Sequence, residues 1–181
     1  MAMPTTLIAL LRGINVGKAK RVAMADLRAF VEKLGYTDVR TLLNSGNIVF
    51  TSPKTNGGDA ARRIEEGMTV KLGVSARVTV LTAAELAAAV KGNPLLDVAD
   101  NHSRLLLAFF NDPAHRRKLT PLLERDWARE KLALGKRVAY LWCPDSILES
   151  DLADAVNRAL ADGVTARNWA TVMKLHALCQ E

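Results

Sequence analysis

The spacing of hydrophobic residues predicts the elements of the first half of the chain. A short apolar run over 6–11 is typical of a buried strand. Apolar residues then recur at the spacing of one helix face, which predicts an amphipathic helix. The predicted elements are a strand over 6–11, a helix over 24–34 that ends at Gly35, strands over 39–43 and 48–51 around the turn 44–47, a helix from Asp59 to Gly73, a strand over 76–81 and a helix over 83–90.

The second half of the chain repeats this order. The apolar run 105–110 predicts a strand, and Asp112 before Pro113 predicts a helix start, because proline suits the first helical position. Thr120-Pro121 predicts a kink or a restart in that helix. The later predicted elements are strands over 130–134 and 137–142 around Gly135, a helix over 151–160, a short strand over 164–166 and a final helix over 168–179.

Three helix starts carry residues that are typical of N-caps. Thr82 and Glu85 have the spacing of a capping box, in which each side chain accepts a hydrogen bond from the other residue's backbone N–H. Ser146 and Glu149 have the same spacing before the helix over 151–160. Asp59 is expected to cap its own helix. Large side chains that we expect in the core are Phe30, Leu34, Phe50, Leu107 and Phe109.

The order of elements predicts the fold class. Each half has the order β-α-β-β-α-β-α, which contains the split βαβ arrangement. We therefore expect an α+β protein of two tandem ferredoxin-like units of the βαββαβ type, duplicated and packed together. The first unit is expected over 1–92 and the second, with a C-terminal helix, over 93–181. The sequence leaves open whether the halves fold independently and what oligomer they form.

One connection distinguishes the two halves. Only Asn111 and Asp112 separate the first strand from the first helix in the second half, whereas an insertion over 12–23 separates them in the first. Loops of this length in compact domains are usually functional or disordered. The insertion contains no acidic residue, and its glycines allow the backbone to approach a ligand closely. Its cationic residues are Arg12, Lys18, Lys20 and Arg21.

The excess charge of the chain lies in the same half as the insertion. The formal net charge is +6 at pH 7. Residues 1–92 contain 13 Lys and Arg against 7 Asp and Glu, whereas residues 93–181 contain 12 of each kind. This asymmetry suggests an anionic partner for the first half, such as a nucleic acid or a phosphorylated ligand. The alternative is a basic surface without a partner, which is the commoner case at this charge.

The composition excludes several classes of protein. Hydrophobic residues make up 49% and charged residues 24%, which is typical of a globular protein and not of a disordered one. After the start of the chain, the longest uncharged run, 41–53, is too short and too polar to cross a bilayer. Residues 1–6 carry no cation, so no secretory leader is expected. Cys143 and Cys179 form no disulfide framework, and we expect reduced thiols in a cytoplasmic protein.

The insertion and the turn 44–47 are expected to converge. In a ferredoxin-like unit the first two strands run parallel with the third between them, so the end of the first strand and the turn share one edge of the sheet. Cations, amides, glycine N–H groups and the positive end of the next helix can bind an anion there. Taken alone, 45–47 is simply a good turn, and an N-cap is the simpler role for Asn168. The candidate ligand-binding residues are Arg12, Asn15, Gly17, Lys18, Lys20, Arg21, Ser45, Gly46, Asn47, Arg167 and Asn168.

No motif predicts a particular catalytic chemistry. The spacing from Gly13 to Lys18 is shorter than in a P-loop, and Ala19 stands where that motif has a hydroxyl. The three histidines lack metal-binding spacing, so we expect no metal and no cofactor. Aromatic residues make up 5% of the chain and the third predicted strand offers only Phe50, which argues against a base-stacking RNA-binding sheet. The sequence leaves the question of enzymatic activity open.

Three segments resemble a known family. They read LLRGINVGKAKRVAMADLR (10–28), GYTDVRTLLNSGNIVF (35–50) and TARNWATVMKL (165–175), and they resemble the bacterial family known as domain of unknown function 1697. The resemblance implies a small cytoplasmic α+β protein with two similar halves, and it brings no established activity, substrate or cofactor. The chain departs from the family pattern, in which glycine, proline, glutamine or other polar residues are common, at Lys18, Ala23, Asn44, Ala170 and Met173.

Three functions remain as alternatives at this stage. The first is a binding module that holds a phosphate-bearing ligand, nucleic acid included, through the basic loop 12–21. The second is a small enzyme that acts on a phosphorylated metabolite at the same loop, which a buried acid or cysteine facing the loop would favour. The third is an assembly protein whose loop contacts another subunit.

Overall fold

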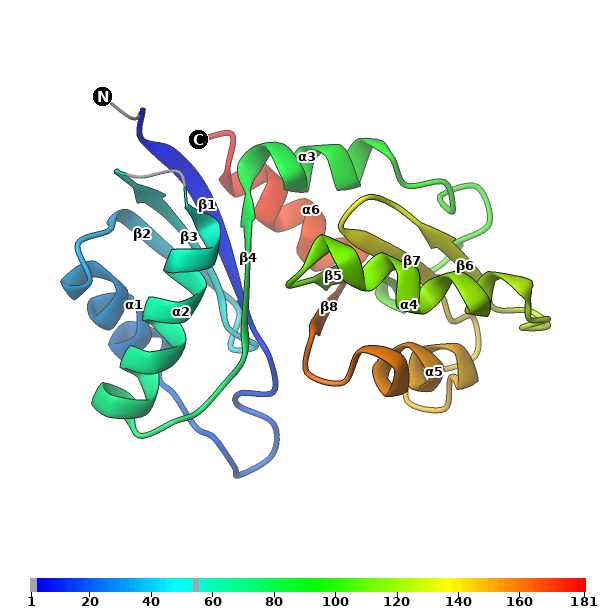
Figure 1. The fold of residues 1–181 in the computed structure, drawn as a ribbon, viewed down its shortest axis with the longest axis horizontal. Coiled ribbons are helices and arrows are strands. Elements are labelled where there is room, and N and C mark those ends of the chain that lie inside the picture. Colours follow the sequence, from blue (N-terminus) through cyan, green and yellow to red (C-terminus); the bar gives the residue numbers. More distant parts are fainter. Residues whose placement is uncertain (1–2, 54–55) are drawn as a thin grey trace. The chain divides into compact units, whose positions relative to one another are not determined.

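The computed structural model describes residues 3–53 and 56–181, and the chain forms two compact units. The first unit contains Met1–Leu86 and Ala177–Glu181, and the second contains Ala87–His176. The division falls inside the helix Ala83–Lys91 (α3). Each unit has its own four-stranded antiparallel sheet (Figure 1).

The first unit is a sheet with two helices packed on it. Its other elements, in chain order, are β1 (Thr5–Leu11), α1 (Met24–Lys33), β2 (Thr37–Leu42), β3 (Asn47–Ser52), α2 (Gly57–Gly67), the π-helix η1 (Met68–Leu72) and β4 (Val78–Thr82). The strand order is β2-β3-β1-β4, and every neighbouring pair is antiparallel. Since β3 lies between β1 and β2, these two strands run parallel, as expected. The end of β1 and the β2–β3 turn therefore share one edge of the sheet.

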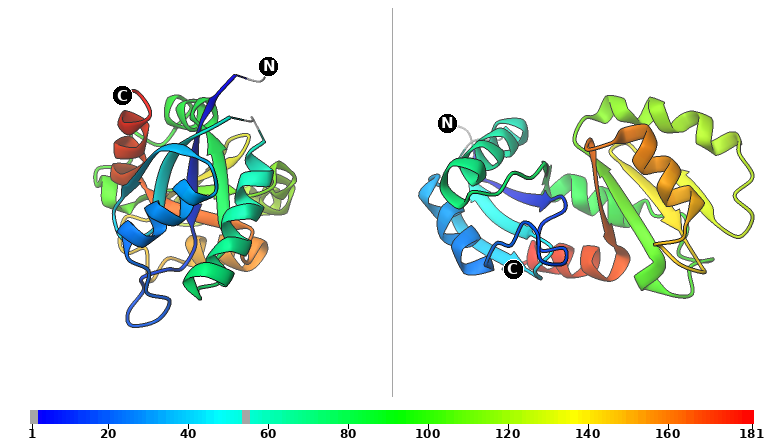
Figure 2. Two further views of the ribbon diagram at one scale, coloured as in Figure 1. Left: turned by 90° about the vertical axis from the view of Figure 1, so that its left-hand side faces the viewer. Right: turned by 90° about the horizontal axis from the view of Figure 1, so that it is seen from below.

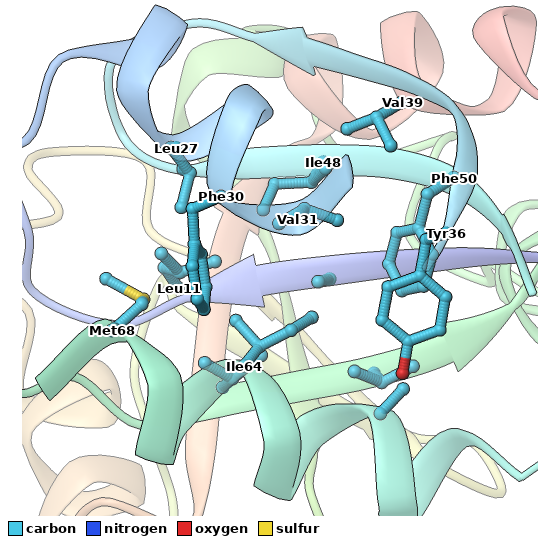
Figure 3. Close-up of a cluster of buried hydrophobic side chains, with 14 of the residues drawn as sticks. Leu11, Leu27, Phe30, Val31, Tyr36, Val39, Ile48, Phe50, Ile64 and Met68 are labelled. Carbon is cyan, nitrogen blue, oxygen red and sulfur yellow. The ribbon is translucent and has the colours of Figure 1, made fainter. Parts of the chain in front are cut away.

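The core of the first unit lies between its sheet and the helices α1 and α2 (Figure 3). Phe30 of α1 and Met68 of η1 point into this core, and the ring of Tyr36 packs against Phe50 with the centroids 4.7 Å apart. Phe30 and Phe50 are buried as predicted, whereas Leu34 is only partly buried at the edge of the cluster. Apolar contact between helices and sheet is the main stabilising term of such a layer.

The second unit is also built on one sheet. Its elements are η2 (His102–Arg104), β5 (Leu105–Phe110), η3 (Pro113–His115), α4 (Arg116–Leu119), η4 (Thr120–Glu124), β6 (Lys131–Leu134), β7 (Val138–Trp142), α5 (Asp151–Leu160), β8 (Val164–Asn168) and α6 (Trp169–Leu178), of which α6 ends in the first unit. The strand order is β6-β7-β5-β8, again with antiparallel neighbours.

A separate core lies beneath α4 and α5. Leu119 of α4 and Leu152 of α5 pack with Phe110 of β5, and both helices lie on the same face of the sheet (Figure 2). Leu107 and Phe109 of β5 are buried as predicted. Along both β5 and β1, residues of both faces are buried, which explains why these strands read as continuous apolar runs rather than alternating ones.

The helix caps follow the prediction in one case and differ in two. Thr82 and Glu85 form the capping box: the Thr82 N–H donates to Glu85 Oε2 at 2.8 Å and the Glu85 N–H donates to Thr82 Oγ1 at 3.1 Å. Asp59 was expected to cap α2, but Asn56 does so by accepting the Asp59 N–H at 3.1 Å. The predicted box at Ser146 and Glu149 closes only a turn.

Ser150 is the N-cap of α5 in place of that box. Its Oγ accepts the Ala153 N–H at 2.9 Å and donates to Oε2 of Glu130. The other oxygen of Glu130 accepts the Leu152 N–H at 3.2 Å. Two residues far apart in the sequence therefore satisfy the first N–H groups of one helix, and the carboxylate is favourable at its positive end.

Two helical segments are less regular than their patterns indicate. The helix predicted after Asp112 begins as the 3₁₀ helix η3 and becomes α4 for one turn. From Thr120 it continues as the 3₁₀ helix η4, which has proline in its first turn. The helix predicted to end at Gly73 does end there, in the left-handed conformation, but its last turn is the π-helix η1.

Candidate functional site

The end of β1 is tied to both neighbouring strands. The Leu11 N–H donates to Gly46 O, and the Arg12 N–H donates to Arg77 O, both at 2.9 Å. Ile14 follows with only 2% of its surface exposed and anchors the insertion in the core of the first unit. The insertion therefore leaves the sheet from a fixed base.

Residues 15–20 form a small two-stranded projection, which we call the finger. The Asn15 N–H donates to Lys20 O at 3.0 Å, and Val16 and Ala19 form an antiparallel bridge. Gly17 has a φ of +60°, which allows the tight reversal at the tip. In Figure 1 and in the left panel of Figure 2 the loop after β1 extends beyond the end of the first sheet.

The side chain of Asn15 joins the finger to its surroundings. Its Nδ2 donates to Val22 O at 2.9 Å and to Asn44 O, in the β2–β3 turn, at 2.7 Å. Its Oδ1 accepts the Val22 N–H at 2.8 Å. The expected convergence of insertion and turn is therefore present, and an amide that was expected to meet a ligand is used to hold the two together.

The turn has an internal amide of its own. Asn47 is fully buried, and its Nδ2 donates to Leu42 O at 2.7 Å and to Ser45 Oγ at 2.9 Å. Gly46 has a φ of +88°, and a Cβ there would lie 2.8 Å from both Ile14 Cδ1 and Leu11 Cβ. Gly46 is thus required both by its conformation and by the close approach of the insertion.

Unusual backbone conformations gather in this region. Of the eleven described residues with positive φ, six lie in the insertion or in the turn. Non-glycine residues in this conformation cost of the order of 1–3 kcal/mol each and cluster at functional sites in proteins. The six are Gly13, Asn15, Gly17, Lys20, Leu43 and Gly46.

The cationic side chains of the insertion have different environments. Lys18 and Lys20 are exposed, and in the described part of the chain neither side chain forms a hydrogen bond or an ion pair. Arg21 is exposed too, but its Nη1 donates back to Gly17 O at 3.2 Å. Arg12 is half-buried at the base of the insertion. The two lysines are therefore the cations most available to an external anion.

A small cavity lies between the finger, the turn and the start of α1. Its volume is about 310 Å³, and its lining residues are Asn15, Arg21, Val22, Ala23 and Asn44. Ala23 is the N-cap of α1 and offers no side-chain acceptor, so the positive end of the helix is not capped by a side chain. Asp26 in the first turn offsets part of that positive potential.

Arg167 and Asn168 belong to the second unit, at the junction of β8 and α6. Asn168 caps α6, because its Oδ1 accepts the Thr171 N–H at 2.9 Å. Burial lowers the pKa of Arg167 to about 10, and its Nη1 donates to Ala166 O at 2.9 Å. Their role toward a ligand stays a prediction.

Several residues that shape the site were not among the predicted ones. Ile14 and Val22 anchor the two ends of the loop, Asn44 supplies the carbonyl that Asn15 binds, and Arg77 supplies the carbonyl that holds Arg12. These contributions come from backbone atoms or apolar packing, which residue type does not signal. Only Asn44 carried a signal, as a turn residue next to the predicted group.

Two cysteine thiols have pKa values that burial raises. Burial raises the pKa of Cys143 to about 11, and burial also raises the pKa of Cys179. Across residues 3–53 and 56–181 no group of three or more His, Cys, Asp or Glu side chains could hold a metal ion. Over the same ranges, no helix has the length and apolar character needed to span a membrane.

The fold defines a mixed α+β protein with two four-stranded antiparallel sheets. The chain belongs to the family described as "Protein of unknown function (DUF1697)", whose sequence model matches residues 4–140, and this confirms the resemblance seen in the sequence motifs. No curated protein matches it in sequence. Its fold is similar to that of the conserved bacterial protein SP0830 from Streptococcus pneumoniae, with a TM-score of 0.79 at 23% identity, over 97% of this chain and 99% of that one.

Proposed function

We propose that this protein binds a phosphate-bearing ligand through residues 12–21, and that the ligand is a nucleic acid. The observation that carries the proposal is the pair Lys18 and Lys20, which are exposed and unpaired in the described part of the chain on a hydrogen-bonded finger. Lysines that only solubilise a surface do not need a projection that is fixed at its base. A fixed projection does suit cations that must meet phosphates in a defined arrangement.

The unusual backbone of the region supports the same proposal. Asn15, Lys20 and Leu43 have left-handed backbone conformations, which cost free energy in non-glycine residues. Such conformations persist only where the surrounding packing and hydrogen bonds hold them. Such conformations persist where they serve a function more often than elsewhere. No acidic residue lies within 12–23 to neutralise the cations.

The exposed geometry favours a polymer over a small metabolite. A small phosphorylated ligand is usually enclosed by its pocket, whereas Lys18 and Lys20 lie outside the cavity. The lining of that cavity contains neither a carboxylate nor a thiol to support the enzyme alternative. The finger has no aromatic residue for stacking on bases, so contacts to phosphates would dominate the affinity.

Salt dependence of binding tests the proposal. We would titrate labelled single-stranded and duplex DNA with the protein at several salt concentrations. Each lysine that contacts duplex phosphate makes the slope of log K against log salt more negative by about 0.9. The magnitude of the slope should therefore fall by about 1.8 in the variant Lys18→Ala with Lys20→Ala. A matched control is Arg117→Ala with Lys118→Ala, which removes two exposed cations from α4.

The three possible outcomes are distinct. A lower slope for the finger variant and an unchanged slope for the α4 variant support the proposal. Equal slopes for wild type and the finger variant would remove the finger from nucleic-acid binding. Direct binding of inorganic triphosphate at low concentration, with no binding of either DNA, would indicate a small phosphorylated ligand instead.

We also propose that the two units descend by duplication from one ferredoxin-like unit of a bacterial cytoplasmic protein, with the duplicated halves at 1–92 and 93–181. The support is the shared order of elements and the shared strand order, β2-β3-β1-β4 and β6-β7-β5-β8. The two free cysteines suit a reducing compartment. Superposing the two units in an experimental structure tests the duplication, which unequal strand pairings would contradict.

A further inference from the structure

The Asn15 side chain is committed to the protein rather than to a ligand. Both of its amide hydrogens are used, because Nδ2 donates to Val22 O and to Asn44 O. Its carbonyl oxygen accepts the Val22 N–H. Asn15 therefore joins the two ends of the finger region to each other and to a turn that lies 29 residues further along the chain.

We infer that Asn15 is the positioning residue of the phosphate site: it locks the finger onto the β2–β3 turn and so fixes Lys18 and Lys20 for the ligand. The inference rests on the proposed function and adds the residue that pre-organises it. A loop that is already ordered loses less conformational entropy on binding, so its affinity is higher than that of a mobile loop with the same charges.

The chemistry of asparagine fits this position in two ways. Its backbone has a φ of +54°, which asparagine tolerates better than most side chains do. Its amide offers a donor group and an acceptor together, whereas aspartate offers acceptors only and glycine offers neither. Substitution at one position can therefore separate the backbone requirement from the hydrogen bonds.

The turn is prepared to receive this lock. Asn47 fixes the turn from inside through Leu42 O and Ser45 Oγ, and Leu43, with a φ of +59°, sets the direction of the chain before Asn44. The Asn44 carbonyl is thus held where Nδ2 of Asn15 meets it at 2.7 Å. The Asn47 amide thus fixes the turn, and the Asn15 amide joins the turn to the finger.

Hydrogen exchange tests the lock without any ligand. In Asn15→Gly the left-handed backbone is tolerated and the side-chain amide is lost. Exchange of the Val22 N–H should then accelerate by about tenfold, because losing one hydrogen bond changes the opening equilibrium by about that factor. Asn15→Asp keeps the acceptor, so this N–H should stay closer to the wild-type rate. Asn56→Ala, which removes the cap of α2 and no bond to the finger, is the matched control and should leave it unchanged.

Binding of a short labelled DNA duplex completes the test. Asn15→Gly should lower the affinity by about tenfold with an unchanged salt slope, because the slope counts phosphates contacted and both lysines remain. Lys18→Ala with Lys20→Ala should lower the slope and leave the Val22 exchange rate at the wild-type value. General destabilisation of the protein would not separate the effects on exchange and on the salt slope in this way. Asn56→Ala serves as the control for general destabilisation.

Each contrary result has its own meaning. Wild-type exchange at Val22 in Asn15→Gly would overturn the lock, and so would wild-type affinity in a variant whose exchange is accelerated, while the proposed function would stand in both cases. Binding by the wild type that does not depend on Lys18 and Lys20 would overturn the proposed function, and the inference would fall with it.

Discussion

The first strands of the two units end alike and continue differently. In each unit the backbone N–H of the strand's last residue donates to the carbonyl of the residue just before the neighbouring inner strand, β3 or β7. The N–H of the following residue donates to the carbonyl of the residue just before the neighbouring edge strand, β4 or β8. The bonds are Leu11 to Gly46 and Arg12 to Arg77 in the first unit, and Phe110 to Arg137 and Asn111 to Gly163 in the second, at 2.9, 2.9, 3.0 and 3.1 Å.

Beyond these bonds the two connections have little in common. In the second unit Asp112 caps η3 at once, because its side chain accepts the Ala114 N–H at 2.9 Å, and Pro113 follows at the first helical position. In the first unit residues 12–23 intervene before α1. The comparison shows that this sheet needs only two residues to enter its helix, so the insertion is not required by the fold.

The cores of the two units provide the largest expected effect. Phe30→Ala in the first unit should lower the free energy of unfolding by about 3–5 kcal/mol, and Leu119→Ala in the second by about 2–5 kcal/mol, because each leaves a cavity beneath a helix. Both side chains are at most 6% exposed. Denaturant unfolding measures both losses, and a loss below about 1 kcal/mol in either variant would show that this helix packs loosely.

Alanine substitutions at two glycines of the candidate site separate the cost of overpacking from the cost of backbone conformation. Gly46→Ala should cost about 2–4 kcal/mol, because the strained φ adds to overpacking against Ile14 and Leu11. Gly17→Ala should cost only about 1–2 kcal/mol, since a Cβ there meets nothing within 4 Å and only the left-handed conformation is penalised. Equal losses in thermal unfolding would show that the turn and the insertion are not in close contact.

The pH dependence of stability should show a smaller effect that belongs to the second unit. The Cys143 thiol is buried, and burial raises its pKa from 9.0 to about 11. Between these pH values the unfolded chain releases the proton and the folded chain retains it, so this thiol's contribution to stability is present below pH 9 and is lost as pH rises toward 11. Cys143→Ala should reduce the decline in denaturant midpoint over this range, and an equal decline in the variant would contradict the assignment.

The order of elements and the meeting of insertion and turn could be predicted from the sequence. Period and turn residues define the strands, and the antiparallel pairing of β3 with β1 and β2 then brings the two segments to one edge. The capping box at Thr82 and Glu85 is local, so its spacing suffices. The cap and the β2–β3 hairpin depend only on residues that are close in the chain, whereas the pairing of β3 with β1 follows from the order of the elements.

The misplaced caps show where local spacing fails. Asn56 and Asp59 are both good cap residues three positions apart, and only the path of the chain into α2 selects Asn56. Ser146 and Ser150 offer a similar choice, and Glu130, which lies 20 residues before Ser150, stabilises the second of them. The role of Asn15 was missed for the same reason, because its partner Asn44 becomes a neighbour only after folding.

Mapping the bound ligand on the backbone amides tests whether the finger binds nucleic acid. We would titrate ¹⁵N-labelled wild-type protein with a short DNA duplex and follow the amide chemical shifts of both units. If the finger binds the duplex, the largest shifts are expected at Gly17, Lys18 and Lys20, with none at Asn111 and Ala114 in the corresponding connection of the second unit. Shifts confined to the second unit, or an unchanged finger in a protein that binds the duplex, would contradict it.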